Sequence, residues 1–288
     1  MGISDDVNAW FGVHARDLPW RREGFGAWGI LVSEMMLQQT QVDRVIPALA
    51  LWLSRWPAPA ALAASPPGDA VREWDRLGYP RRALRLHAAA TEITERHGGV
   101  VPSDVDALLA LPGIGEYTAR AVAAFAYGVR VPVVDTNVRR VLARAVLGQG
   151  EAGPPSTQRD LALMESVLPP DPAAARVTNA AVMELGALVC VSRAPRCSEC
   201  PIASRCEWRS AGYPPYEGPR AARQGRFEGS DRQVRGAILR ELRGSDIPVS
   251  LASLEAVCTD HVQRDRAIAG LLADGLVVAV DSGFALPH

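Results

Sequence analysis

The sequence contains no lysine, because all 31 basic residues, set against 32 acidic ones, are arginine. No side-chain amine can therefore form a Schiff base with a substrate, which leaves only the N-terminal amine. Long apolar runs are also missing, since none approaches the ~18 residues that suggest a membrane span. The polar, acidic start of the chain does not resemble a secretory signal. We therefore expect a cytoplasmic protein with no membrane partner.

Strand signals are scarce before residue 270, whereas apolar residues recur at three- and four-residue intervals along most of the chain. This pattern predicts a mostly α fold. The segment 210–230 is rich in Gly, Pro and Arg, which is typical of a linker. Three further helical stretches and an alternating pair, Leu276–Val280 and Gly283–Leu286, predict a small winged-helix-like module at 231–288.

Two groups of arginines lie on predicted helices. We interpret each group as a solvated helix face rather than a DNA contact, because charged residues on a helix usually face water. The net charge of −1 likewise gives no general basic footprint for nucleic acid. The groups are Arg81, Arg82 and Arg85, and Arg139, Arg140 and Arg144.

Four of the five cysteines fall in one short segment with the spacing C-x6-C-x2-C-x5-C. In a cytoplasmic chain, such a group is more typical of a metal site than of disulfides. Four thiolates can hold zinc or a 4Fe–4S cluster. Structural zinc usually has two short C-x2-C pairs, and this segment has one, so the spacing favours the cluster. The predicted ligands are Cys190, Cys197, Cys200 and Cys206.

A glycine-rich turn, Leu111-Pro112-Gly113-Ile114-Gly115, lies between two helical stretches. Its glycines permit close approach of the backbone to another molecule, and the following helix start can hold a phosphate. By itself this turn is also compatible with a plain connection between two helices, although the glycines favour a binding turn. Further along, Val133-Val134-Asp135 directly precedes another helix. Asp135 is a favoured N-cap, and its carboxylate can also stabilise a cation.

The hairpin, the aspartate and the cysteine segment together resemble the helix-hairpin-helix glycosylase superfamily, in its endonuclease III-like iron–sulfur branch. The resemblance covers about 10–208. It implies one 4Fe–4S cluster, double-stranded DNA as partner, and DNA contacts by Gly113, Gly115 and Arg196. It also implies an iron–sulfur domain formed by 1–22 and 135–209, and a six-helix barrel domain at 23–134.

Tyr117 occupies the place where bifunctional relatives carry a nucleophilic lysine. The chain therefore resembles the monofunctional branch, which hydrolyses the glycosidic bond without cutting the strand. The string Glu34-Met35-Met36-Leu37-Gln38-Gln39-Thr40-Gln41 resembles the catalytic helix of the MutY-type adenine glycosylases, in a short form without their Nudix-like domain. Burial among apolar neighbours would favour the protonated form of Glu34.

The resemblance to MutY-type enzymes implies a role for each remaining site residue. A flipped adenine, opposite 8-oxoguanine or guanine, would be protonated by Glu34 while Asp135 stabilises the sugar cation. Tyr117 and Asn137 would position Asp135. Trp20 and Arg21 would line the base pocket, and Gln39 and Tyr79 would insert into the duplex.

Two other functions remain open on the sequence. One is a mismatch-specific thymine or uracil glycosylase on the same scaffold, which can also have tyrosine at the lysine position. The other is a non-catalytic iron–sulfur protein that binds DNA. The pair Glu34 and Asp135 argues against the latter, since binding alone needs neither acid. We expect a monomer that works on DNA of the nucleoid and recognises an adenine mispair.

Overall fold

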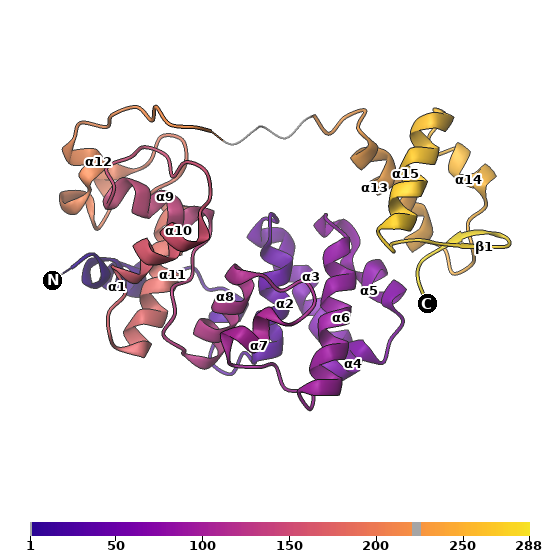
Figure 1. The fold of residues 1–288 in the computed structure, drawn as a ribbon, viewed down its shortest axis with the longest axis horizontal. Helices are drawn as coiled ribbons and strands as arrows, with labels where there is room; N and C mark the ends of the chain where they lie inside the picture. Colours follow the sequence, from indigo (N-terminus) through magenta and orange to yellow (C-terminus); the bar gives the residue numbers. More distant parts are fainter. Residues whose placement is uncertain (1, 221–225) are drawn as a thin grey trace. The chain divides into compact units, whose positions relative to one another are not determined.

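The periodic apolar pattern folds into helices along most of the chain, as predicted (Figure 1). The structure is a computed structural model that describes residues 2–220 and 226–288. Part of the expected linker, 221–225, lies outside the described residues. The chain divides into two compact units. The first comprises 1–30, 103–109 and 115–222, and the second 31–102, 110–114 and 223–288.

The core of the first unit lies between three of its helices. Helix α11 packs against both α1 and α9, and Val7, Leu142 and Leu185 are buried where they meet. The α-helices of this unit are α1 (Ile3–His14), α7 (Val105–Leu109), α8 (Glu116–Tyr127), α9 (Thr136–Ala145), α10 (Thr157–Glu165), α11 (Pro172–Leu188) and α12 (Glu207–Ser210). Its 3-10 turns are η1 (Pro19–Arg21), η3 (Cys197–Glu199) and η4 (Ala203–Arg205).

The second unit begins within helix α2 and is organised around α6, which packs against α4 and α5. Trp52 and Trp74 meet edge to face, with ring centroids 5.5 Å apart, in its core. The elements are α2 (Ala27–Leu37), α3 (Val42–Arg55), α4 (Pro59–Ala63), α5 (Pro67–Trp74), η2 (Asp75–Leu77), α6 (Arg81–Arg96), α13 (Asp231–Arg243), α14 (Leu251–Glu255), α15 (His261–Ala273), β1 (Val278–Val280) and β2 (Gly283–Ala285).

The C-terminal segment forms the three helices and the hairpin that the sequence predicts. Strands β1 and β2 pair antiparallel, and Val249 adds a bridge to Phe284. This module also packs on α5. Gly68 N donates to Pro287 O at 2.7 Å, and a Cβ at Gly68 would lie 2.3 Å from that oxygen, so only glycine fits there.

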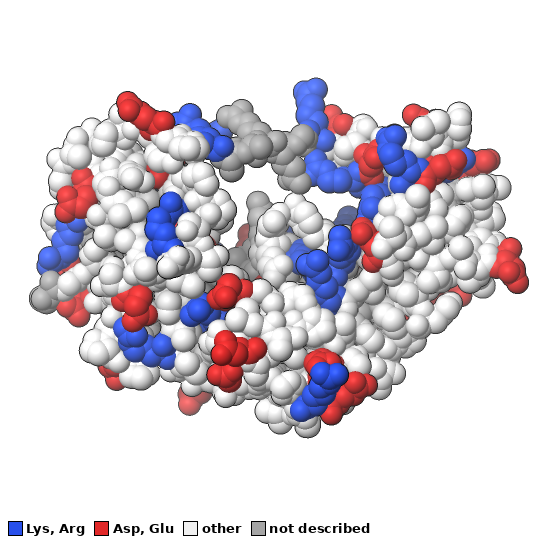
Figure 2. Space-filling model, in the orientation of Figure 1, with Lys and Arg blue, Asp and Glu red and all other residues white. Residues whose placement is uncertain are grey.

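Two arginines correct the interpretation of their groups as solvated faces. Arg82 is 5% exposed and Arg144 is 4% exposed. That interpretation is wrong for both, because each guanidinium points inward and donates to several backbone carbonyls. Elsewhere charges of both signs are interspersed, as Figure 2 shows for the face drawn there.

No helix in the described ranges is long and apolar enough to cross a membrane. The two compact units divide the chain differently from the domains expected on the sequence, since 223–288 is grouped with 31–102 and helix α8 with the first unit. The expected division into an iron–sulfur domain, a barrel and a separate module remains a prediction.

Candidate active site

Asp135 is the N-cap residue directly before helix α9, and both of its carboxylate oxygens accept hydrogen bonds. Oδ1 accepts from Val138 N at 2.7 Å, as an N-cap does, and Oδ2 accepts from Asn137 Nδ2 at 2.8 Å. Desolvation raises the pKa of Asp135, and the hydrogen bonds from Val138 and Asn137 partly offset this rise. The carboxylate is therefore fixed in direction and taken largely out of water.

Asn137 is itself held by Arg140, one turn along α9. Arg140 Nη2 donates to Asn137 Oδ1 at 2.8 Å and to Gly186 O at 2.7 Å, and Arg140 Nε donates to Cys190 O at 2.7 Å. Residue 186 must be glycine, since a Cβ there would lie 2.7 Å from Asn137 Cβ. A continuous chain of contacts thus joins Asp135 to the backbone of the first cysteine.

Tyr117 lies in the first turn of α8, half-buried. It packs on the apolar cluster of Ala121, Ala124 and Val133. Val133 lies two residues before Asp135 in the sequence. Tyr117 and the segment leading to Asp135 therefore share one cluster in the first unit.

The hairpin glycines have different backbone requirements. Gly113 has φ +76°, which favours glycine, and a Cβ there would lie 2.5 Å from Arg85 Cβ. Both the backbone conformation and the lack of space therefore require glycine at this position. Gly115 has an ordinary extended φ of −107° and is the N-cap of α8. Both are exposed, which leaves this turn accessible.

Arg21 has a structural partner that the sequence did not reveal. Its guanidinium makes two bonds to the carboxylate of Glu184, at 3.1 and 2.9 Å, and Arg16 makes two more, at 2.8 and 2.7 Å. Glu184 is 1% exposed. These arginines, against the opposing effect of desolvation, lower the pKa of Glu184 to about 2. Trp20, next to Arg21 in η1, is half-buried.

Glu34 is the only ionisable side chain of helix α2, whose whole length is described. Its side chain is 4% exposed, and its helix neighbours Val32 and Met35 are fully buried. A carboxyl in such surroundings favours the neutral, protonated form unless a cation is near. Glu34 belongs to the second unit, and Asp135 to the first.

Gln39 and Tyr79 share an uncommon backbone conformation. Their φ angles are +57° and +46°, in the left-handed region that residues other than glycine rarely adopt. Both are exposed, Tyr79 to 45%. Such positions cluster at functional sites, because the surrounding structure must hold them.

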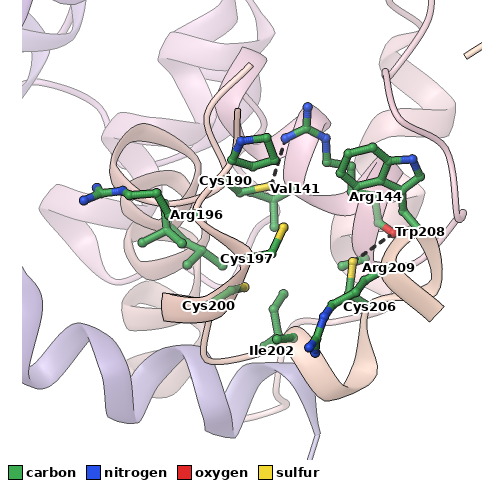
Figure 3. Close-up of a pocket in the computed structure, with 15 residues that line it drawn as sticks. Val141, Arg144, Cys190, Arg196, Cys197, Cys200, Ile202, Cys206, Trp208 and Arg209 are labelled. Atoms are coloured by element: carbon green, nitrogen blue, oxygen red, sulfur yellow. Dashed lines mark hydrogen bonds between the residues drawn. The ribbon is translucent and has the colours of Figure 1, made fainter. Parts of the chain in front are cut away.

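The four predicted cysteine ligands line one pocket, with Arg144 at its edge (Figure 3). All four are free thiols, each partly buried. Arg144 Nη1 contacts Cys190 Sγ at 3.4 Å, and Cys206 Sγ contacts Arg144 O at 3.5 Å. Arg196 also lines this pocket; its guanidinium is half exposed and lies 3.4 Å from Glu199.

The pocket suits a cationic group held by sulfur. Burial raises the pKa of the Cys190 thiol and raises that of Cys200 to about 11, and neighbouring cysteines add to both shifts. Metals bind the thiolate form, which burial makes unfavourable here. A positive centre among the sulfurs must therefore offset the cost of ionising these thiols. The described residues contain no group of three or more side chains arranged around a single ion. Four sulfurs that line one pocket fit a metal centre held by thiolates.

Comparisons with known proteins indicate the same superfamily that the sequence motifs resemble. Residues 32–166 match the family described as "HhH-GPD superfamily base excision DNA repair protein". The chain is 55% identical to the adenine DNA glycosylase of Mycolicibacterium smegmatis, over 99% of this chain and 97% of that protein. It is 54% identical to the one from Mycobacterium tuberculosis H37Rv, over 99% and 94%.

The chain belongs to the adenine DNA glycosylase family. The fold agrees, since a solved thermostable thymine-DNA glycosylase matches with a TM-score of 0.66 at 25% identity, over 72% of this chain and 95% of that one. The mostly helical helix-hairpin-helix fold and the family expected from the sequence are therefore confirmed.

Three residues have structural roles that the sequence did not reveal: Arg82, Arg140 and Glu184. Each has partners far along the chain, as with Glu184 and Arg16, which are 168 residues apart. One signal was available for Arg82, which falls on the apolar face of α6 with Leu86 and Ile93.

Proposed function

We propose that this protein is a monofunctional adenine DNA glycosylase that removes adenine paired with 8-oxoguanine or guanine. The observation that carries the proposal is the 55% identity to an adenine DNA glycosylase over 99% of this chain. The fixed carboxylate of Asp135 and the buried Glu34 support it, because glycosidic hydrolysis needs an acid and a cation-stabilising group. The substrate is double-stranded DNA, and the enzyme acts as a cytoplasmic monomer at the nucleoid.

The reaction breaks the bond between C1′ and N9 of a flipped-out adenine. Glu34 donates its proton to N7, so the bonding electron pair leaves with a neutral base. The ionised Asp135 stabilises the positive charge on the sugar. Water then adds to C1′ and returns a proton to Glu34. The products are free adenine and an abasic site in an intact strand.

The remaining predicted residues have positioning and binding roles in this proposal. Asn137 and Tyr117 orient Asp135 and the sugar, and Trp20 and Arg21 border the base. Arg21 reaches this role already fixed by Glu184, so it would present a rigid edge. The backbone at Gly113 and Gly115 and the side chain of Arg196 contact phosphates, while Gln39 and Tyr79 enter the duplex.

We propose that Cys190, Cys197, Cys200 and Cys206 hold one 4Fe–4S cluster. When bound, the cluster ties the cysteine segment together and offsets the thiolate charge. Arg144 stabilises the thiolate of Cys190 from the protein side. Arg140 ties the backbone of Cys190 to Asn137, so an ordered segment helps to keep Asp135 in place.

The alternative is a thymine or uracil glycosylase, favoured by the structural likeness to the thymine-DNA glycosylase. A panel of labelled duplexes separates the two functions. We expect release of adenine opposite 8-oxoguanine, slower release opposite guanine, and no release of thymine or uracil opposite guanine. Faster release of thymine or uracil than of adenine would establish the alternative.

A further inference from the structure

The turns that bear Gln39 and Tyr79 converge on one buried side chain, Arg82 of α6. Its Nη1 donates to three carbonyls at the end of α2 and just beyond it. These are Met35 O at 2.7 Å, Met36 O at 3.1 Å and Gln38 O at 2.7 Å. The last carbonyls of a helix lack partners within the helix, and a cation is favourable there.

The other terminal nitrogen of Arg82 reaches the second turn. Nη2 donates to Gly78 O at 2.9 Å and to Leu77 O at 3.3 Å, just before Tyr79. It also donates to Thr40 Oγ1 at 3.1 Å, and Thr40 in turn donates to Leu77 O at 3.0 Å. One planar guanidinium therefore joins both turns, and Thr40 adds a second link.

No carboxylate pairs with Arg82 in the described part of the chain. Its charge is balanced by carbonyl dipoles and by two aromatic rings, Trp74 at 5.1 Å and Tyr79 itself at 5.7 Å from the guanidinium carbon. Desolvation lowers the pKa of Arg82 to about 10, which still leaves it cationic at neutral pH. A buried arginine without an acid is costly unless its donors are satisfied. Among the described residues both terminal nitrogens of Arg82 have acceptors, whereas its Nε has none.

We propose that Arg82 is a positioning residue that holds Gln39 and Tyr79 ready to enter the duplex. The inference rests on the proposed function, which assigns DNA insertion to these two residues. Both have strained, left-handed backbones, and such conformations persist only where neighbouring structure fixes them. Arg82 supplies this restraint to both turns at once, so the two side chains are presented together.

A double-mutant cycle in the full-length protein tests this coupling. We compare wild type, Arg82→Met, Tyr79→Ala and the double variant on a duplex with adenine opposite 8-oxoguanine. The duplex carries 2-aminopurine beside the target, because its fluorescence rises when the stack is opened. The readouts are that rise and the single-turnover rate of adenine release. Arg96→Met, at an exposed place on the same helix, is the matched control.

We expect each single variant to lose the fluorescence rise and to slow release about tenfold or more, since a step that needs both turns fails when either is lost. The double variant should be no slower than the slower single variant, and Arg96→Met should match wild type. Independent, multiplying losses would overturn the proposal. So would an Arg82→Met protein that opens the stack like wild type, or a Tyr79→Ala protein that does.

Thr40→Val keeps the proposal testable if Arg82→Met does not fold. This near-isosteric change removes the hydroxyl link between the turns and leaves the buried charge in place. We expect it to weaken the fluorescence rise and to add nothing to Tyr79→Ala. Additive losses would count against the coupling. Failure of the proposed function is recognised separately, because wild type itself would then release no adenine.

Discussion

Asn137 donates a hydrogen bond from Nδ2 to Oδ2 of Asp135 at 2.8 Å, two residues away at the start of α9. A donor favours the ionised form of its acceptor, so Asn137 holds down a pKa that desolvation raises. The carboxylate must be ionised to stabilise a cation. Together with Val138 and Arg140, Asn137 therefore lowers the pH above which Asp135 can work.

Asn137→Ala should move the acidic limb of the pH–rate profile to higher pH. Loss of the donor raises the pKa of Asp135 further, so the ionised form appears later as pH rises. Single-turnover rates across pH measure this shift. Asn8→Ala, which removes another half-buried amide in the first unit, should leave the limb in place. An equal loss of rate at every pH would contradict this account of Asn137.

Glu184 should make the free energy of unfolding depend on pH in the acidic range. Its folded pKa of about 2 lies below the ordinary 4.5, so unfolding takes up a proton. The stabilisation is complete above pH 4.5 and is lost as pH falls towards about 2. At 1.36 kcal/mol per pKa unit it amounts to about 3 kcal/mol.

Urea unfolding at several pH values measures this contribution. Glu184→Gln should lose a few kcal/mol at pH 7, of the size expected when a buried pair loses one member (~3–5 kcal/mol). It should also show a flatter acid dependence. Glu165→Gln, whose partner Arg130 pairs with it at the surface, is the control and should cost under ~1 kcal/mol. A full-sized acid dependence in Glu184→Gln would assign the effect to other carboxylates.

Cys197→Ser should reduce iron and labile sulfide in the purified protein and lower its melting temperature. The reason is that the serine hydroxyl is a poor substitute for a thiolate ligand. Cys258→Ser is the matched control, since Cys258 is a partly buried free thiol outside the pocket. Iron and zinc analysis after anaerobic purification decides the metal. Stoichiometric zinc without iron in the wild type would refute the cluster.

Local sequence patterns predicted those parts of the fold and site that depend on interactions between residues close together in the chain. Asp135 was predictable as an N-cap, because the residue directly before a helix accepts its first N–H groups. The terminal hairpin was predictable from alternation around Asp281 and Ser282. In both cases the interacting residues lie only a few positions apart.

The rest depended on contacts that the chain makes only after folding. Arg82 lies 47 residues from Met35, and a helical arginine gives no sign of which carbonyls it will meet. Burial of Arg82 follows from the end of α2, whose carbonyls need donors. The docking of the C-terminal module on α5 through Gly68 was hidden for the same reason.

Borohydride should trap no covalent adduct between the enzyme and its mispair. The chain has no lysine, and the phenol of Tyr117 cannot form an imine. The product strand should stay intact until alkali is added. A lysine-bearing endonuclease III assayed in parallel shows that trapping works. Efficient trapping by this protein would mean that an amine attacks C1′ and that the monofunctional assignment is wrong.

The role of Glu34 as proton donor is the centre of the account, and single-turnover release of adenine opposite 8-oxoguanine tests it most directly. Glu34→Gln should still bind the duplex with an affinity close to wild type. Its rate of adenine release should fall by about 10²–10⁴-fold, the usual contribution of general acid–base catalysis. Near-normal release by a folded Glu34→Gln protein would contradict the account and assign the proton to another group.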